Sequence, residues 1–470
     1  MHIIPLNYAD DSTALFESIR HLPYPAFLDS STSPSRAGHY DILCAAPACR
    51  VISSKALTWR ENNNGQRTPL QGTPFQALKQ VLLEYGFADN DKAPAEPNTF
   101  PFIGGALGYF GYDLGRCLES MPSLASADID IADMQMGIYP WAIIVDHSKQ
   151  QSSLVYRDSS LKSQLEVLAS QINSDTRSAT IKDNGFQLNS AFTSNLDYSC
   201  YSERFHRVIN YIRSGDCYQV NLAQRFTASY QGDSWQAYLF LRKQAPTPFS
   251  AYLQVDGGEL LSLSPERFIK VADRHVETKP IKGTRPRGST PAQDLMHQES
   301  LSRSSKDKAE NLMIVDLLRN DLGRSCRIGS ISVPKLFEVE SYANVHHLVS
   351  TVQGELGHRK DCLDLLEGCF PGGSITGAPK IRAMEVIEEL EPHRRSAYCG
   401  SIGYIGFDGN VDTNIAIRTI VAHDQQLHCW AGGGIVADSQ CSSEYQETFD
   451  KISNLIKPLE DSFHDSNDRP

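Results

Sequence analysis

Two predicted helices each begin with a pair of carboxylates. Asp307 and Glu310 stand one turn apart near the start of the first, and Glu444 and Glu447 repeat the spacing in the second. Acidic residues in a first turn often do no more than complement the helix dipole. Two such pairs in one chain favour a further role, because carboxylate oxygens are the ligands that Mg²⁺ prefers while it keeps positions open for an anionic substrate. We therefore expect a magnesium site where the two helix starts meet.

The apolar pattern predicts how these two helices pack. The first helix, residues 304–318, carries one apolar stripe that we expect to face the core: Ala309, Leu312, Met313 and Leu317. The second begins near Ser443, which is spaced from Gln446 as in a capping box. Its predicted buried stripe is Tyr445, Phe449, Ile452 and Ile456.

A lysine lies on a predicted hairpin that turns at Asp273-Arg274. Counting outward from the turn along 260–272 and 276–283 places Glu266 opposite Ile281 or Lys282. One interpretation is that Glu266 and Lys282 form an exposed cross-strand ion pair, which would contribute little to stability. The other interpretation is that Lys282 is a nucleophile, because the glycine that follows it permits close approach of a ligand. That role needs a pKa lowered from about 10.4, which burial supplies.

Two glycine-rich segments predict anion binding. Residues 370–380 lead into a helix with Pro379 near its first turn, so that backbone N–H groups and Ser374 or Thr376 can face an anion. The segment lacks the lysine of a phosphate-binding loop. Residues 432–437 fit a dinucleotide fingerprint only nominally, since no helix follows, and a backbone nest for a carboxylate fits better.

Composition excludes several classes of protein. The 470 residues include 44 Lys and Arg against 56 Asp and Glu, a net charge of -12, without a basic stripe, so no nucleic acid is expected as a partner. No apolar stretch is long enough to span a membrane, and the first twenty residues do not resemble a secretion signal. The 11 cysteines form no C-x-x-C pair, which indicates reduced thiols in a cytoplasmic protein. Nucleophile-elbow and H-E-x-x-H motifs are absent.

The order of strand-like and helix-like segments does not alternate regularly, so we expect an antiparallel α+β fold. Residues 173–195 are poor in apolar periodicity and are predicted to be a linker-like loop. It would separate an N-terminal region, 1–172, from a catalytic region, 196–459. An acidic, disordered tail is predicted for 460–470.

Together these motifs resemble the chorismate-utilising enzymes. The matching segments stand in the order of that family: 280–284, 309–321, 347–350, 370–380, 417–419 and 432–451. The segment 102–113 is similar to the aminating branch, the large components of anthranilate synthase and aminodeoxychorismate synthase. The resemblance implies a large α/β sandwich of two antiparallel sheets with helices packed outside and the active site between the sheets.

Two positions indicate the reaction within the family. Members that add water to chorismate carry a lysine where this chain has Gln219. Anthranilate synthases typically carry Ala at the third position of Pro-Ile-x-Gly-Thr, whereas Lys282 is characteristic of aminodeoxychorismate synthase large components, in p-aminobenzoate and folate biosynthesis. The alternatives are anthranilate synthesis and a non-catalytic amino-acid-binding regulator with the same fold.

The resemblance also implies roles for single residues. Lys282 would attack C2 of chorismate as the 4-hydroxyl leaves, and ammonia would then add at C4 and expel the lysine, giving 4-amino-4-deoxychorismate. Glu266 would be the general acid, and His347 would contact the ring. Mg²⁺ would be held by Glu310 and Glu447, with Asp307 and Glu444 nearby. The implied substrate-binding residues are Gly283, Thr284, Ser374, Tyr398, Arg418 and Gly434.

Two binding partners besides chorismate follow from the same resemblance. The chain has no glutaminase motif, so ammonia would come from a separate glutamine amidotransferase (glutaminase) subunit in a heterodimer. Aminating relatives also carry an amino-acid pocket, often for L-tryptophan, away from the active site. Its implied lining here is Ser30, Tyr40, Pro248, Phe249 and Ser250, although Gly38-His39-Tyr40 departs from the usual Arg-Tyr-Ser pattern.

Overall fold

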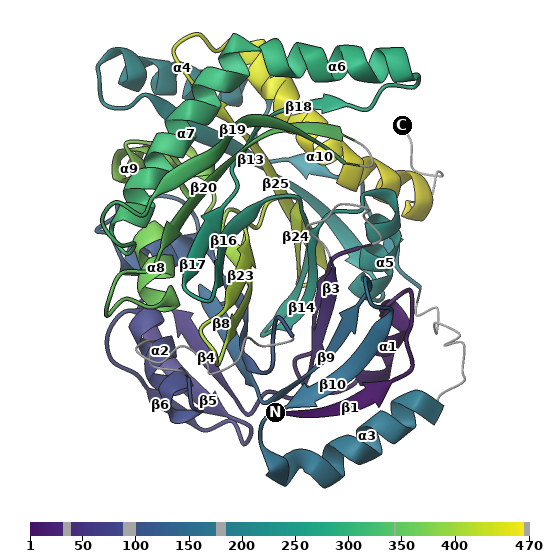
Figure 1. Ribbon diagram of the computed structural model, residues 1–470. Helices are drawn as coiled ribbons and strands as arrows, with labels where there is room; N and C mark the ends of the chain where they lie inside the picture. Colours follow the sequence, from purple (N-terminus) through teal and green to yellow (C-terminus); the bar gives the residue numbers. More distant parts are fainter. Residues whose placement is uncertain (32–38, 88–99, 175–184, 343–344, 465–470) are drawn as a thin grey trace.

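The computed structural model describes residues 1–31, 39–87, 100–174, 185–342 and 345–464. Two large antiparallel sheets face each other, and helices pack around them (Figure 1). The predicted α+β sandwich is therefore confirmed. In the described part of the chain, no helix has an apolar stretch of the length needed to cross a membrane.

The first sheet has 13 strands. Its order is β1 (His2–Leu6), β10 (Gln151–Tyr156), β9 (Trp141–Asp146), β3 (Tyr40–Cys44), β2 (Ala26–Asp29), β14 (Phe249–Val255), β15 (Gly258–Ser264), β24 (Thr419–His423), β25 (Gln426–Ile435), β13 (Gln219–Gln231) and β11 (Gln187–Leu188). The short strands β12 (Thr193–Ser194) and β21 (Gly377–Ala378) also pair with β13.

The second sheet has 12 strands. Its order is β18 (Ile281–Pro286), β20 (Val345–Glu355), β17 (His275–Thr278), β16 (Arg267–Ala272), β23 (Val411–Asn414), β22 (Ser401–Gly406), β7 (Gly105–Phe110), β8 (Met134–Tyr139), β4 (Cys49–Ser54), β5 (Leu57–Asn62) and β6 (Arg67–Pro69). Strand β19 (Ser332–Ser341) pairs with β20.

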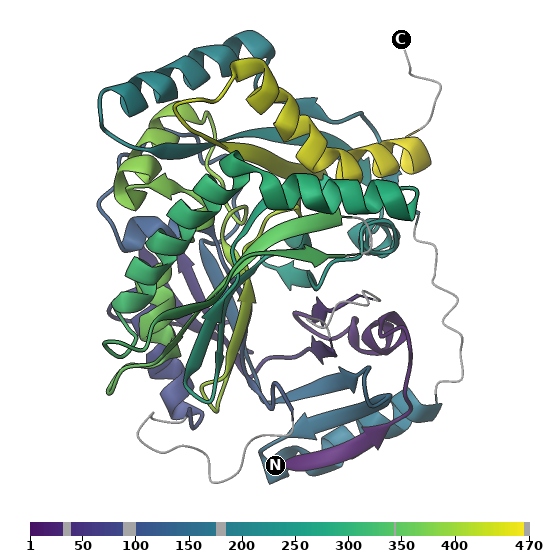
Figure 2. The ribbon, with the colours of Figure 1, turned by 45° about the horizontal axis from the view of Figure 1, so that its top comes forward.

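Helices cover the outer faces of the sandwich (Figure 2). They are α1 (Thr13–Ile19), α2 (Pro74–Glu84), α3 (Lys162–Ser174), α4 (Tyr198–Arg213), α5 (Ser234–Gln244), α6 (Pro291–Arg303), α7 (Ser305–Gly323), α8 (Cys362–Cys369), α9 (Lys380–Leu390) and α10 (Cys441–Phe463). Alternate residues of the first sheet explain the layering: Ala26 belongs to the large apolar cluster that also includes residues of the second sheet, whereas Phe27 packs in a second cluster with residues of α1, α3, α5 and α10.

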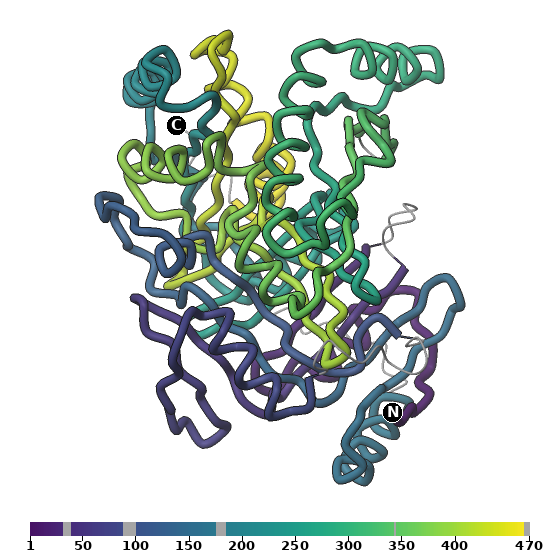
Figure 3. Tube along the Cα trace, turned by 60° about the vertical axis from the view of Figure 1, so that its left-hand side comes forward, coloured from purple at the N-terminus to yellow at the C-terminus, as the bar shows by residue number. Residues whose placement is uncertain are grey.

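Both sheets contain strands from each side of the segment 173–195. Strand β2 pairs with β14 in the first sheet, and β7 pairs with β22 in the second. The trace in Figure 3 shows the purple N-terminal chain lying against the later chain. The division into two regions remains a prediction from the sequence. Residues 175–184 of the linker and 465–470 of the tail lie outside the described residues, and α10 extends into the predicted tail as far as Phe463.

The chain crosses from one sheet to the other between β15 and β16. The sequence predicted one long strand over 260–272, but β15 ends at Ser264 and β16 begins in the other sheet at Arg267. The predicted hairpin turn is confirmed, because Asp273 and Arg274 have φ values of 48° and 69°, as a tight two-residue hairpin turn requires. Glu266 consequently lies at the junction of the two sheets.

Two predictions about helix packing were wrong. The buried face of α7 is Asn311, Ile314, Val315, Leu318, Asp321 and Leu322. Leu312 of the predicted stripe is 46% exposed, because apolar residues fill more than one stripe of this helix. Helix α10 begins at Cys441 without a side-chain cap, so Ser443 forms no capping box. Ser439 instead donates a hydrogen bond of 2.7 Å to Glu444.

Candidate active site

A bulge in β18 presents Lys282. The register against β20 shifts by one residue between Ile281 and Thr284, so the pair Lys282-Gly283 lies outside regular pairing. Gly283 has φ +79°, and a Cβ there would lie 2.8 Å from the Asp307 side chain. Only glycine therefore allows β18 to lie this close to α7. The bulge leaves Lys282 half-buried, with Nζ 3.4 Å from the carbonyl oxygen of Ser374.

Glu266 lies behind this lysine and is 5% exposed. Burial raises the pKa of its carboxyl group to about 7, although the Ser374 hydroxyl and the charge of Lys282 act in the opposite direction. Burial also lowers the pKa of Lys282, against the attraction of Glu310 and Glu266. A carboxylic acid and an amine that both exchange protons nearer to neutrality suit acid–base and nucleophilic chemistry. The geometry does not match an exposed ion pair.

His347 lies on β20, opposite Thr284 in the bulged pairing. Its Nδ1 is 2.9 Å from the Thr284 hydroxyl. Burial, together with the nearby charge of Arg418, lowers the pKa of His347 to about 3. The imidazole is therefore neutral at physiological pH and can offer a hydrogen bond, but no charge, to a bound ring.

Arg418 directly precedes β24 and has φ 49°. Burial alone lowers the pKa of its guanidinium, and no carboxylate of the described residues forms an ion pair with it. A buried cation without a partner is costly unless an anion binds to it. Tyr398 is buried at 4% exposure and stacks on Trp430 with centroids 5.9 Å apart. The predicted carboxylate-binding residues are thus a half-buried cation and a fixed phenol.

The two acidic helix starts do converge. Lys306 Nζ lies 3.8 Å from Glu310 of α7 and 3.9 Å from Glu444 of α10. Burial raises the pKa of both carboxyl groups. Burial would also raise the pKa of Glu447, but an ion pair of 2.5 Å with Lys451 holds it below its ordinary value. The structure therefore brings three of the predicted metal ligands to one place.

Asp307 makes a different contact. It forms an ion pair of 3.0 Å with Arg285. No group of three or more His, Cys, Asp or Glu residues in the described chain is close enough to form a metal site by itself. Mg²⁺ commonly takes only one or two protein carboxylates and completes its shell with water and substrate. The carboxylate oxygens of Glu310, Glu444 and Glu447 fit that donor set.

The glycines at 432–434 make room for these side chains. They lie in the extended strand β25, so the predicted backbone nest is absent there. A Cβ on Gly433 would lie 2.9 Å from Glu444, and one on Gly434 would lie 1.8 Å from Gln219. Gln219 is 1% exposed, and its Oε1 has no hydrogen-bond partner among the residues that the structure describes. An unpartnered buried amide oxygen beside the carboxylates indicates that a ligand or water completes the site.

Two lysines of the site were not predicted from the sequence. Lys306 precedes the acidic pair of α7 and bridges the two helix starts. Lys451 donates a hydrogen bond of 2.9 Å to the carbonyl oxygen of Gly432 and also pairs with Glu447. Lys451 stands one turn after Glu447, and this i, i+4 spacing was the available signal.

A cavity lies between the sheets, and Lys282 is not part of its lining. It has a volume of about 820 Å³, and its lining includes all five residues implied for an amino-acid pocket: Ser30, Tyr40, Pro248, Phe249 and Ser250. Strands β2, β3 and β14 supply one wall, and β16, β22 and β23 supply the other. The cavity is large enough for a ligand of amino-acid size.

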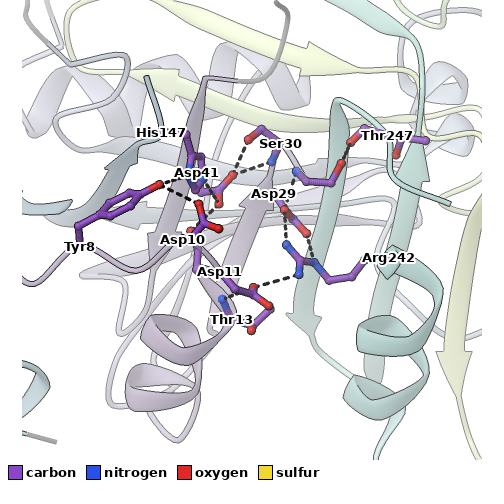
Figure 4. Close-up of polar contacts among 12 residues, drawn as sticks. Tyr8, Asp10, Asp11, Thr13, Asp29, Ser30, Asp41, His147, Arg242 and Thr247 are labelled. Atoms are coloured by element: carbon purple, nitrogen blue, oxygen red, sulfur yellow. Dashed lines mark hydrogen bonds and ion pairs between the residues drawn. The ribbon is translucent and has the colours of Figure 1, made fainter. Parts of the chain in front are cut away.

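A charged network supports one wall of this cavity (Figure 4). Asp41 accepts hydrogen bonds of 2.7 Å from both the backbone and hydroxyl of Ser30, and lies 2.9 Å from His147. Burial would raise the pKa of Asp41, but His147 and its other donors hold it below its ordinary value. Asp29 accepts hydrogen bonds of 2.7 and 3.1 Å from Nε and Nη2 of Arg242. The network holds Ser30 rigidly at the cavity wall.

Comparison with known proteins identifies the family. The family described as chorismate binding enzyme matches residues 27–457. The chain belongs to the chorismate-binding enzymes. It is 47% identical over 459 residues to aminodeoxychorismate synthase component 1 of Escherichia coli K12, covering 97% of this chain and 98% of that protein. It is 34% identical to anthranilate synthase component 1 of Acetivibrio thermocellus, over 98% and 96% of the two chains.

The fold agrees with a solved member of the family. The crystal structure of anthranilate synthase component I from Streptococcus pneumoniae superposes with a TM-score of 0.78 at 30% identity, covering 90% of this chain and 93% of that one. The fold of two facing sheets is thus shared with that member of the family.

Proposed function

We propose that this chain converts chorismate and ammonia to 4-amino-4-deoxychorismate. The observation that carries the proposal is the pairing of Lys282, whose pKa is lowered by burial, with the buried acid Glu266, whose pKa is raised to about 7. The 47% identity to the aminodeoxychorismate synthase component of E. coli supports the same reaction. Gln219, where a lysine would serve to add water, is consistent with amination.

The reaction proceeds in two substitutions. The free amine of Lys282 attacks C2 of chorismate, the ring double bond shifts, and the C4 hydroxyl leaves as water with the proton of Glu266. Ammonia then adds at C4, the double bond shifts back, and the nitrogen of Lys282 leaves C2. Glu266 regains its proton from the new ammonium group. The net change exchanges a hydroxyl for an amino group and releases one water, and the covalent step divides one difficult substitution into two.

The enzyme's binding groups orient the ring for both steps. Arg418 and Tyr398 hold the enolpyruvyl carboxylate, and the neutral His347 contacts the ring near the reacting carbons. The carboxylates of Glu310, Glu444 and Glu447 would hold Mg²⁺, with Asp307 as an outer neighbour. When bound, Mg²⁺ neutralises the ring carboxylate of chorismate and fixes its position.

A separate glutaminase subunit supplies the ammonia in this proposal, and the complex acts in the cytoplasm. The relatives named component 1 support a partner component. The deciding experiment incubates the purified chain with chorismate, Mg²⁺ and either ammonium at pH 8.5 or glutamine. We expect 4-amino-4-deoxychorismate from ammonium and no product from glutamine. Anthranilate with pyruvate would instead assign the sister reaction, and product from glutamine alone would contradict the need for a partner.

The cavity lined by Ser30 and Phe249 is proposed to bind an L-amino acid such as tryptophan. Asp29 and Ser30 of the charged network line the cavity and suit an α-ammonium group, and Phe249 suits an apolar side chain. Titration of the chain with tryptophan, monitored by thermal unfolding, should raise the midpoint temperature, and Ser30→Val should abolish the shift. Equal shifts with wild type and variant would contradict binding at this cavity.

A further inference from the structure

A buried ion pair lies directly behind the proposed active site. Arg395 is 1% exposed and Glu391 is 5% exposed. They are joined by two hydrogen bonds, from Nε to Oε2 at 2.9 Å and from Nη2 to Oε1 at 2.6 Å. A buried ion pair seldom stabilises a fold more than apolar residues of the same size would. The reason for this buried ion pair is therefore to be found in the other contacts that Arg395 makes.

Two of these contacts hold the backbone of segments that carry site residues. Nη1 of Arg395 donates 2.9 Å to the carbonyl oxygen of Ile375, the residue after Ser374. Nη2 donates 2.7 Å to the carbonyl oxygen of Asn221, which lies opposite Gly434 in the first sheet. A single guanidinium therefore joins the Ser374 turn to strand β13.

The same guanidinium packs against two tyrosines. Its Cζ lies 4.8 Å from the ring centroid of Tyr112 and 5.8 Å from that of Tyr398. Tyr398 also stacks on Trp430. The ring of Tyr398 is thus fixed by Arg395 and Trp430, neither of which has a role in the proposed chemical steps.

The segment 111–113 supports this arrangement from the N-terminal region. The backbone N–H of Tyr112 donates 2.8 Å to the Ser396 carbonyl oxygen, and Ser396 N–H donates 2.8 Å to Asp113. Ser396 has φ 53°, in the left-handed region that non-glycine residues adopt only when neighbours enforce it. Tyr112 and Asp113 enforce it, and the turn that results carries Arg395 and Tyr398.

We infer that Arg395 is the positioning residue for the enolpyruvyl-carboxylate subsite. It fixes Tyr398 and the Ser374 turn relative to each other, and Tyr112 and Asp113 hold the turn on which it stands. The inference rests on the proposed function only for the identity of the ligand. It also gives a use to the 102–113 segment, which the chemical steps leave unassigned.

A double-mutant cycle tests the inference. Arg395→Lys keeps the charge beside Glu391 but loses the fork that reaches Ile375 and Asn221. We expect kcat/KM for chorismate, with ammonium as the nitrogen source, to fall by about tenfold or more. In a Tyr398→Phe background the same change should cost less than about threefold, because the residue acts through Tyr398.

Arg50→Lys provides the matched control. Arg50 is 6% exposed, pairs with Glu61 and Asp256, and packs 3.7 Å from the ring of Tyr24, far along the second sheet from the site. This change should lower the midpoint of thermal unfolding as Arg395→Lys does, yet leave kcat/KM within about twofold of wild type. Equal kinetic effects of the two lysine variants would reduce Arg395 to a structural role and overturn the inference.

Two further readouts cover the remaining outcomes. If Arg395→Lys does not fold, Tyr112→Leu is the second variant, because it removes one of the two tyrosine rings that pack against Arg395. It should raise KM for chorismate by about threefold or more, and this effect should be non-additive with that of Tyr398→Phe. Multiplicative effects in either cycle would contradict positioning through Tyr398. The dissociation constant for chorismate separates this inference from the proposed function: a wild type that binds chorismate without making the amino product refutes the reaction, and the cycle is then measured on binding.

Discussion

The Nζ atom of Lys282 lies 3.4 Å from the carbonyl oxygen of Ser374. The hydroxyl of the same serine hydrogen-bonds Glu266 and acts to lower the pKa of that carboxyl group against the larger effect of burial. One serine on the turn before α9 therefore contacts both the proposed nucleophile and the proposed acid. Ser374→Ala should raise the pKa of Glu266 still further above its ordinary value and move the pH dependence of turnover in the same direction.

Lys282→Ala removes the proposed nucleophile. Turnover should fall by about a thousandfold, while chorismate binding and the unfolding midpoint stay close to wild type. Some activity should remain, because ammonia can attack directly in a site that still orients the substrate. Mass spectrometry of wild type mixed with chorismate and Mg²⁺, without ammonia, should find an adduct on the peptide that contains Lys282.

Lys282→Arg is the charge-retaining control for that experiment. Arginine keeps the positive charge but does not deprotonate, so this variant should be as slow as Lys282→Ala. A fully active arginine variant, together with no adduct in the wild type, would refute covalent catalysis by this residue.

Glu266→Gln should change how stability depends on pH. Burial raises the pKa of Glu266 to about 7 in the folded state from 4.5, so the folded protein holds a proton that the unfolded chain releases. Stability from this group is present below pH 4.5 and is lost as the pH rises through about 7. Relative to wild type, Glu266→Gln should gain on the order of 2–3 kcal/mol in unfolding free energy between pH 4 and pH 8.

Urea unfolding of both proteins at pH 4 and pH 8 measures that difference. A pH-independent difference would show that Glu266 titrates near its ordinary pKa. The same substitution should lower turnover by about a hundredfold or more, since the amide cannot donate a proton to the leaving hydroxyl.

Arg418→Gln should improve stability and impair binding together. The guanidinium is half-buried without an ion-pair partner in the described chain, and burial lowers its pKa. Its removal should raise the unfolding free energy by about 1 kcal/mol. The dissociation constant for chorismate should rise by about tenfold or more, because the enolpyruvyl carboxylate loses its cation. A destabilised variant with unchanged affinity would assign Arg418 to the fold instead.

Glu310→Gln and Glu447→Gln should weaken Mg²⁺ binding. Titration calorimetry in the presence of chorismate should show at least about a tenfold loss of Mg²⁺ affinity for each variant. Without Mg²⁺, Glu310→Gln should be at least as stable as wild type, because burial and neighbouring carboxylates raise the pKa of Glu310. Glu367→Gln, a substitution of another acid with a raised pKa on α8, should leave Mg²⁺ affinity unchanged.

Much of the site could be predicted because it depends on local chain geometry. The turn at Asp273-Arg274 sets the register by which Glu266 meets Ile281, and the structure shows that backbone contact. Pro379 directly precedes α9, as the glycine-rich segment indicated. The resemblance to the family also indicated Arg418 and Tyr398. Spacing along the sequence does not show which residues lie near these two in space.

The rest depends on packing between distant segments. The face of α7 was mispredicted because its sequence is apolar on several sides, and only contact with β20 and α8 decides which side is buried. The glycines at 432–434 were expected to bind an anion through their backbone, whereas they give space to Glu444 and Gln219. The i, i+4 spacing of Glu391 and Arg395 was an available signal for their ion pair. It did not indicate the backbone acceptors of Arg395, because Ile375 and Asn221 lie 20 and 174 residues away in the sequence.

The sharing of both sheets by the two parts of the chain has a consequence for synthesis on the ribosome. The N-terminal part can pair its own strands into two partial sheets, which end at β2 and β7. The open edges of those strands are apolar and become covered only by β14 and β22. Until residues 249–255 and 401–406 have been translated, the nascent chain carries two unprotected strand edges, the kind of surface that chaperones protect from aggregation.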